Sequence, residues 1–176
     1  MGLHDDLIGQ IVDGGFCSGC GICAGMRGLG RIEMRLSAQG NMRPFVVDGG
    51  EESEADRLRQ VCPGINLVHA SATRRKHPIW GPIEAVRTGH AVDEDLRRHG
   101  SSGGVVSAIA LYLVESGRVD FVAQIAASSQ NPLSNEVQMS RTREDVLRAA
   151  GSRYAPAAPL ARMDEFLATG QRFAVI

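Results

Sequence analysis

Apolar residues in the first third of the chain recur at spacings that predict a helix followed by a hairpin. Helical spacing predicts a short helix over residues 4–13, which ends at a pair of glycines. Alternation over residues 32–36, a turn at 39–41 and a second apolar run at 45–47 predict two paired strands. The expected first unit is one helix packed beside one hairpin.

A second helix is predicted from an acidic stretch, because carboxylates stabilise the N-terminus of a helix. It opens near Glu51 and is expected to deliver Leu58 and Val61 to the core and to present Cys62 at its end. The chain then becomes basic and is interrupted by prolines over about residues 71–82. That composition is typical of a connector or a domain edge.

Strands and helices alternate in the second half of the chain, which predicts an α/β layer structure. The helix over 105–116 carries apolar residues around most of its surface, so it is expected to be well buried. The other predicted elements are strands at 83–92, 119–126, 136–140 and 173–176, and helices after Thr142 and at 163–168. Because a functional loop normally follows such a last strand, the chain is expected to be a fragment, the front part of a longer protein.

The composition is that of an ordinary globular protein, since 43% of the 176 residues are hydrophobic and 22% are charged. A net charge of -1 gives no electrostatic footprint for nucleic acid, so no nucleic-acid partner is expected. No apolar run is long enough to span a bilayer, and residues 1–6 lack the features of a signal peptide. The expected location is cytoplasmic, without a transmembrane segment.

All four cysteines of the chain fall into a pattern typical of an iron-sulfur cluster. Cys17, Cys20 and Cys23 form a C-x2-C-x2-C run, and Cys62 stands directly before Pro63. The short spacers let three thiolates wrap one face of a cubane, and the intervening glycines let backbone N–H groups point at its sulfides. The pattern predicts one [4Fe-4S] cluster held by these four metal ligands.

Zinc and disulfides are the other uses of four cysteines. A tetrahedral zinc site usually draws its thiolates from two paired C-x2-C knuckles, whereas this chain has a triplet and a single cysteine. Disulfides fit less well, because cysteines so close on a tight turn seldom pair and no secretory signal indicates an oxidising compartment. Iron-sulfur is the favoured assignment, and zinc remains the alternative.

Several stretches together resemble the beta-subunit family of coenzyme F-420 (deazaflavin) hydrogenases and dehydrogenases. They follow the family's order and are Cys17 to Cys23, Val61 to Gly64, Ser102 to Ala108, Glu115 to Asp120, and Gly151 to Tyr154. Reductases of 7-hydroxymethyl chlorophyll a and divinyl protochlorophyllide look like relatives in the same superfamily. The resemblance covers the N-terminal part of such proteins, whose members continue into a Gly-x-Pro-Cys loop and a further domain.

The resemblance implies FAD as a second cofactor, with two groups of contacts. They are the loop Ser101, Ser102, Gly103 and Gly104, and the segment Ser152, Arg153 and Tyr154. Glycines at a helix start allow close approach of a diphosphate to backbone N–H groups, and an arginine can pair with phosphate or with the reduced ring. The alternatives are a helix N-cap with close glycine packing for the loop, and a helix C-cap with an exposed arginine for the segment.

The predicted organisation is an iron-sulfur module over residues 1–72, then the front part of an α/β flavin-binding domain over 73–176. The function implied is a flavoprotein oxidoreductase subunit that relays electrons between the cluster and FAD, and to or from a deazaflavin-type hydride carrier. Expected partners are a redox protein or the deazaflavin coenzyme, and the C-terminal remainder of the family fold. A non-catalytic cluster- or zinc-binding docking module, and a reductase of a tetrapyrrole or polysaccharide-pathway substrate, remain open. No catalytic residue is identified, so enzymatic activity is left open as well.

Overall fold

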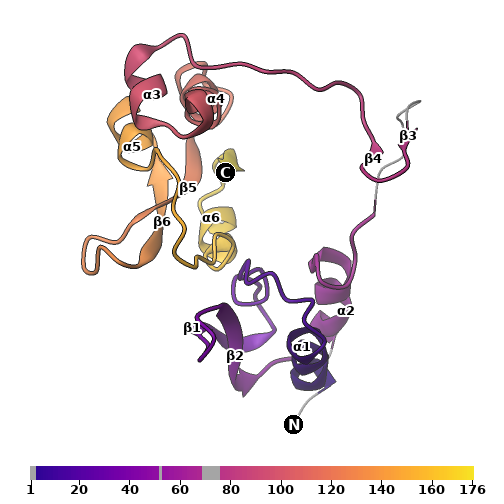
Figure 1. Ribbon diagram of the computed structural model, residues 1–176. Coiled ribbons are helices and arrows are strands. Elements are labelled where there is room, and N and C mark those ends of the chain that lie inside the picture. The colour runs from indigo at the N-terminus through magenta and orange to yellow at the C-terminus, as the bar shows by residue number, and fades with distance from the viewer. Residues whose placement is uncertain (1–2, 52, 69–75) are drawn as a thin grey trace.

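The computed structural model describes residues 3–51, 53–68 and 76–176 (Figure 1). The N-terminal part is a hairpin flanked by two helices, as the sequence predicts. Its elements are α1 (Leu3–Asp13), β1 (Gly30–Leu36), β2 (Met42–Gly49) and α2 (Ser53–Val61). The strands β1 and β2 pair in antiparallel fashion, with Ile32 opposite Val46.

The N-terminal part has a small apolar core of its own. Its buried members are Ile8 from α1, Leu29 and Ile32 near the start of the hairpin, and Leu58 from α2. Leu58 is buried as predicted, but Val61 is 50% exposed, so its predicted place in the core is wrong. Since α2 ends at Val61, this residue lies at the rim of the packed face.

The connector to the second part is extended and carries one very short hairpin, β3 (Lys76–His77) with β4 (Gly81–Pro82). The predicted strand at 83–92 is wrong, because the structure places none of these residues in a strand. Val86 and Val92 are 86% and 91% exposed. Figure 1 shows this segment running across open space before it reaches α3. The predicted domain boundary at residue 72 lies outside the described residues.

The second part is a small mixed sheet with helices on both faces, which confirms the α/β class. Its elements are α3 (Glu94–His99), a 3-10 helix (Ser102–Gly104), α4 (Val105–Glu115), β5 (Phe121–Ala127), β6 (Asn135–Ser140), α5 (Arg143–Arg148), α6 (Met163–Ala168) and β7 (Phe173–Val175). The strand order is β6-β5-β7, in which β5 is antiparallel to β6 and parallel to β7.

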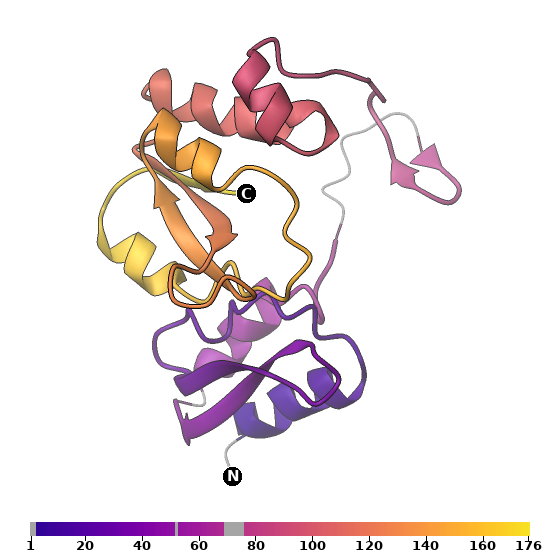
Figure 2. The ribbon, with the colours of Figure 1, turned by 60° about the vertical axis from the view of Figure 1, so that its left-hand side comes forward.

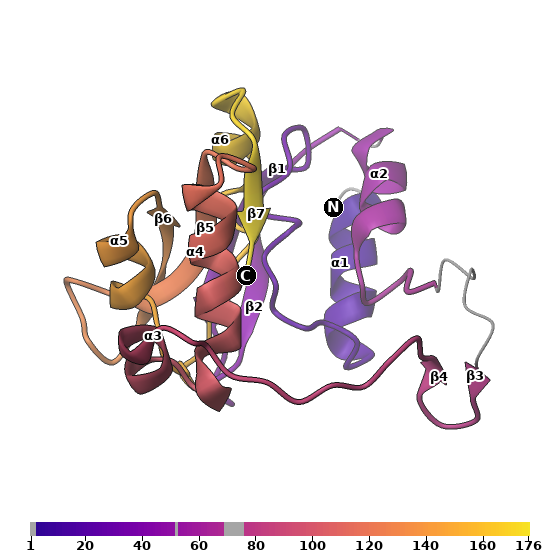
Figure 3. The same cartoon turned by 90° about the horizontal axis from the view of Figure 1, so that it is seen from above.

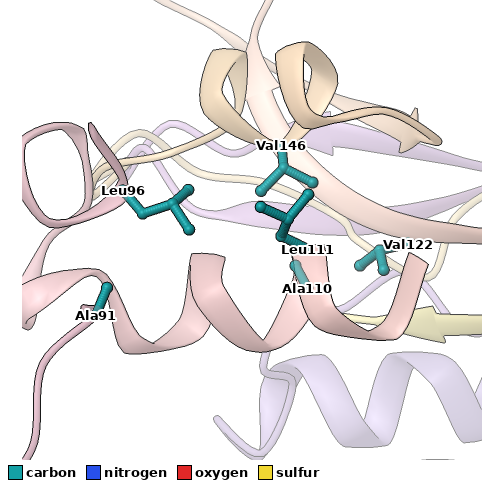
Figure 4. Close-up of a cluster of buried hydrophobic side chains, with 6 residues drawn as sticks. All are labelled: Ala91, Leu96, Ala110, Leu111, Val122 and Val146. Carbon is teal, nitrogen blue, oxygen red and sulfur yellow. The ribbon is translucent and has the colours of Figure 1, made fainter. Parts of the chain in front are cut away.

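Alternate residues of β5 build the cores on the two faces of the sheet. Val122 faces α3, α4 and α5, where it joins the buried cluster drawn in Figure 4. Phe121 and Ala123 face the opposite way and pack around Phe166 of α6. Viewed from above, α4 lies along the sheet, away from α1 and α2 (Figure 3). The described part of the chain contains no helix long and apolar enough to cross a membrane.

Helix α4 packs by one face only, although its composition predicts burial on most sides. Its buried residues are Ser107, Ala110 and Leu111. Val106 and Ile109 are 55% and 50% exposed, so the expected all-round burial is wrong.

Candidate metal centre and ligand cavity

All four cysteines line one small cavity in the N-terminal part, of about 30 Å³. The thiols are unpaired, so no disulfide competes with metal binding in the structure. Apolar side chains complete most of the wall, among them Ile8, Ile11, Val12, Met34 and Leu58. The structure thus brings the triplet Cys17, Cys20 and Cys23 together with the distant Cys62.

Two glycines shape the loop that carries the first three thiols. Gly19 and Gly21 adopt φ angles of 76° and 82°, a backbone region that residues with a Cβ rarely enter. A Cβ on Gly19 would lie 2.7 Å from the carbonyl oxygen of Met42 in β2. The loop therefore depends on glycine at both positions.

Helix α2 delivers the fourth thiol. The N–H of Cys62 donates to the carbonyl oxygen of Leu58 at 2.9 Å, so the cysteine directly extends the last turn. A Cβ on Gly64 would lie 2.7 Å from the carbonyl oxygen of Phe16. This close contact holds the segment after α2 against the segment that leads to Cys17.

Burial makes two of the cysteine thiols, Cys23 and Cys62, harder to ionise. It raises the pKa of Cys23 to about 12, with a smaller contribution from the neighbouring Cys20. Burial also raises the pKa of Cys62, whereas the N–H groups of Gly64 and Ile65, which point at its sulfur, act in the opposite direction. Thiolates in such a setting are favoured once a bound cation supplies compensating charge.

The donor set fits the predicted cluster. Four sulfur donors in an apolar pocket, with backbone N–H groups directed at one of them, are the chemistry that an iron-sulfur cluster requires. Over the described ranges, however, the structure contains no group of three or more His, Cys, Asp or Glu side chains that could hold a metal ion as they stand. A cluster on these four thiols is therefore a proposal.

A second, larger cavity of about 290 Å³ lies in the α/β part. It is lined by four of the residues predicted to contact FAD, namely Ser101, Ser102, Ser152 and Arg153. Two stretches separated by about fifty residues in sequence therefore meet at one cavity. Gly103 and Gly104 do not line it, and neither does Tyr154, which is 94% exposed.

The loop at the start of α4 has an unusual backbone. Ser102, Gly103 and Gly104 have φ angles of 50°, 74° and 73° in succession. A Cβ on Gly104 would lie 2.3 Å from the carbonyl oxygen of Leu96 in α3, so close packing explains this glycine. The capping alternative is not supported at Ser101, whose side chain makes no cap hydrogen bond. The positive φ of Ser102 carries strain, which is typical of functional loops.

Arg153 is tied to the loop between β5 and β6. Its Nε donates to Oδ1 of Asn135 at 2.9 Å, and its Nη2 donates to the carbonyl oxygen of Pro132 at 3.2 Å. Gly151, with a φ of 95°, turns the chain just before it. These contacts fix the backbone of the second segment at the edge of the cavity.

Two buried polar residues of this cavity, Ser107 and Gln124, are not among the residues that the sequence predicts for a ligand site. Gln124 is 5% exposed, and its Oε1 has no hydrogen-bond partner. One available signal was overlooked, because Gln124 is the single strongly polar residue in the otherwise apolar strand Phe121–Ala127.

Residues 154–164 follow Arg153, which lines the larger cavity, and their ribbon passes beside the N-terminal part of the chain (Figure 2). The N–H of Leu160 donates to the carbonyl oxygen of Cys20 at 2.9 Å. The N–H of Asp164 donates to the carbonyl oxygen of Gly25 at 3.0 Å, and its carboxylate pairs with Arg27. We call this contact between residues 20–27 and 158–164 the seam.

The structure is that of a mixed α/β protein in which four thiols line one cavity and several polar side chains line a second. Residues 86–163 match the family described as "Coenzyme F420 hydrogenase/dehydrogenase, beta subunit N-term". The resemblance that the sequence motifs predict is thereby confirmed.

Two characterised proteins are similar in sequence. Coenzyme F420-dependent sulfite reductase of Methanocaldococcus jannaschii is 26% identical over 153 residues, which are 87% of this chain and 22% of that protein. Coenzyme F420 hydrogenase subunit beta of Methanosarcina barkeri is 26% identical over 77 residues, which are 44% of this chain and 26% of that subunit. The chain thus spans about a quarter or less of the length of these relatives.

Among solved structures, a chain of the F420-reducing [NiFe] hydrogenase complex from Methanosarcina barkeri is similar. It has a TM-score of 0.43 and 23% sequence identity, over 49% of this chain and 30% of that chain.

Proposed function

We propose that this chain is the electron-transfer part of a coenzyme F420-dependent oxidoreductase. In this proposal Cys17, Cys20, Cys23 and Cys62 hold a [4Fe-4S] cluster, and FAD occupies the 290 Å³ cavity. The names of the similar proteins, a sulfite reductase and a hydrogenase subunit, support a redox role. Since the chain spans only part of these relatives, their substrates and partner subunits enter here as proposals too.

The seam is the observation that carries the proposal. Only six residues lie between Arg153, at the edge of the larger cavity, and Leu160, whose N–H donates to the carbonyl oxygen of Cys20. A Cβ on Gly21 would lie 2.9 Å from the Cβ of Ala158, so the two segments touch without intervening side chains. In this proposal, direct backbone contact of this kind keeps the cluster and the flavin near each other, and electron relay requires such proximity.

The chain's own residues have three tasks in this function. The four thiols hold the cluster, and apolar neighbours such as Ile8 and Leu58 exclude water from it. The N-terminus of α4, next to Ser101 and Ser102, is suited to a diphosphate because its N–H groups and helix dipole favour an anion. Arg153 adds a positive charge at the same cavity. When bound, a cluster supplies single electrons and a flavin converts them into hydride transfer.

A relay test compares wild-type protein with Cys20→Ser, both reconstituted anaerobically with iron, sulfide and FAD. A one-electron donor such as reduced methyl viologen is added, and the bleaching of the flavin is followed. The wild-type flavin is expected to be reduced faster, because Cys20→Ser should lose the cluster and its broad visible absorption while keeping FAD. Equal rates, or an unchanged cluster spectrum in Cys20→Ser, would contradict the proposal. Zinc in place of iron would instead favour a docking module.

A further inference from the structure

Gln124 stands out as a buried polar side chain whose Oε1 has no hydrogen-bond partner in the described chain. Among the described residues, the buried polar side chains are Ser107, Gln124 and Ser140, and the first two line the 290 Å³ cavity. The Oε1 of Gln124 is the buried side-chain atom of the described chain that lacks a hydrogen-bond partner. An acceptor left this way carries the full cost of its desolvation, so it needs an explanation.

The neighbouring strand provides an internal comparison. Gln138 of β6 lies directly opposite Gln124 of β5, and opposite residues of an antiparallel pair share one face of the sheet. Gln138 is fully engaged: its Nε2 donates to Oγ of Ser140 at 2.9 Å and to the carbonyl oxygen of Asp145 at 2.8 Å. Its Oε1 accepts from Nε of Arg148 at 2.8 Å. The same residue type is therefore structural on β6 and unsatisfied on β5.

The place of Gln124 in the cavity indicates what its partner is. The strained loop Ser101–Ser102 and the first turn of α4, with Val106 and Ser107, form a wall of the same cavity. That wall presents the N-terminal end of an eleven-residue helix, which favours an anionic group. Gln124 presents an acceptor instead, which favours an N–H or O–H donor. The cavity is complementary to a ligand that carries both kinds of group.

We propose that Gln124 is a ligand-binding residue that accepts a hydrogen bond from an N–H or O–H donor of the ligand in this cavity. The inference rests on the proposed function, since FAD is the ligand that tests it. FAD carries hydroxyl and imide donors as well as a diphosphate, so it can satisfy the side chain and the helix terminus together. Gln124 then helps to select ligands that present a donor, because any other ligand leaves the acceptor unpaired.

The test is Gln124→Met, which keeps the length of the side chain and removes its hydrogen-bonding groups. Replacing an unpaired buried acceptor by an apolar group should leave the urea midpoint of the ligand-free protein unchanged or higher. The dissociation constant of FAD, measured by fluorescence titration of the full chain, should rise about tenfold to hundredfold. This combination separates a binding role from a structural one.

Gln138→Met is the matched control. It removes the paired amide opposite Gln124, so it should lower the urea midpoint and leave FAD affinity within about twofold. A Gln124→Met protein that binds FAD like wild type, or that loses stability as Gln138→Met does, overturns the inference alone. If the wild-type chain binds no FAD, the proposed function fails, and this inference fails with it.

Discussion

Replacing Gly25 by alanine tests whether the seam is the tight contact that the structure describes. A Cβ on Gly25 would lie 2.2 Å from the carbonyl oxygen of Leu160 and 2.9 Å from the N atom of Met163. Both obstacles are backbone atoms, so residues 160–163 have to move. The shift would break the hydrogen bonds from Leu160 to Cys20 and from Asp164 to Gly25.

The expected cost follows from these two effects. Overpacking costs about 1–3 kcal/mol, and two backbone hydrogen bonds contribute about 1–3 kcal/mol together. Gly25→Ala should therefore lower the free energy of unfolding by about 2–6 kcal/mol, measured by urea denaturation followed by circular dichroism.

Gly9→Ala is the control for this prediction. Gly9 lies inside α1, and its added Cβ would meet nothing within 4 Å. The same substitution should here stabilise the protein, by about 0.5–1 kcal/mol, because alanine favours a helix over glycine. A Gly25→Ala protein within about 0.5 kcal/mol of wild type would refute the seam as a close backbone contact.

Two further predictions concern the α/β part. A hydrogen bond from Arg143 and one from the N–H of Leu96 hold the pKa of Asp93 at about 2, below its ordinary 3.8. The stabilisation that the ionised Asp93 carboxylate provides is complete above pH 3.8 and is lost as the pH falls towards 2. Asp93→Asn should therefore make the melting temperature fall less steeply between pH 3.8 and pH 2 than it does in wild type. An equally steep fall in both proteins would contradict this prediction. Phe166→Ala empties a fully buried site packed between two aromatic rings and should cost about 3–5 kcal/mol in urea denaturation; a loss below about 1 kcal/mol would show that the site is not tightly packed.

Much of the fold could be predicted because its signals are local. The helical spacing around Ile8 and the alternation around Ile32 correctly predict which residues face the core of the N-terminal part. At Thr142 the sequence carries its own helix start, and the structure shows a full capping box with Asp145. Each of these signals is read within a few residues, so tertiary contacts do not need to be known.

The incorrect predictions concern segments whose secondary structure or burial is determined by contacts with distant parts of the chain. The apolar residues of 83–92 are compatible with a strand, but a strand forms only where another lies beside it. Val106 is apolar and yet exposed, because α4 turns only one face to the sheet. Helix α3 was missed because it is six residues long and buries only Leu96.

The candidate sites also combine features that the sequence predicts with features that it does not predict. The cysteine spacing is a local pattern, and the structure does bring the four thiols to one cavity. Which members of the serine and glycine motifs face the second cavity could not be read, since Gly103 and Gly104 instead serve the packing of the loop against α3 and the connector. Gln124 and the seam depend on contacts between distant segments, which spacing does not reveal.

The most direct test of the account is the metal, sulfide and flavin content of one anaerobic preparation of the full chain. The account predicts about four iron and four sulfide per chain, with the broad absorption of a thiolate-bound cluster. It also predicts about one FAD, released on heating. Stoichiometric zinc without sulfide, or a loaded cluster without any flavin binding, would contradict the central claim that this chain brings the two redox groups together.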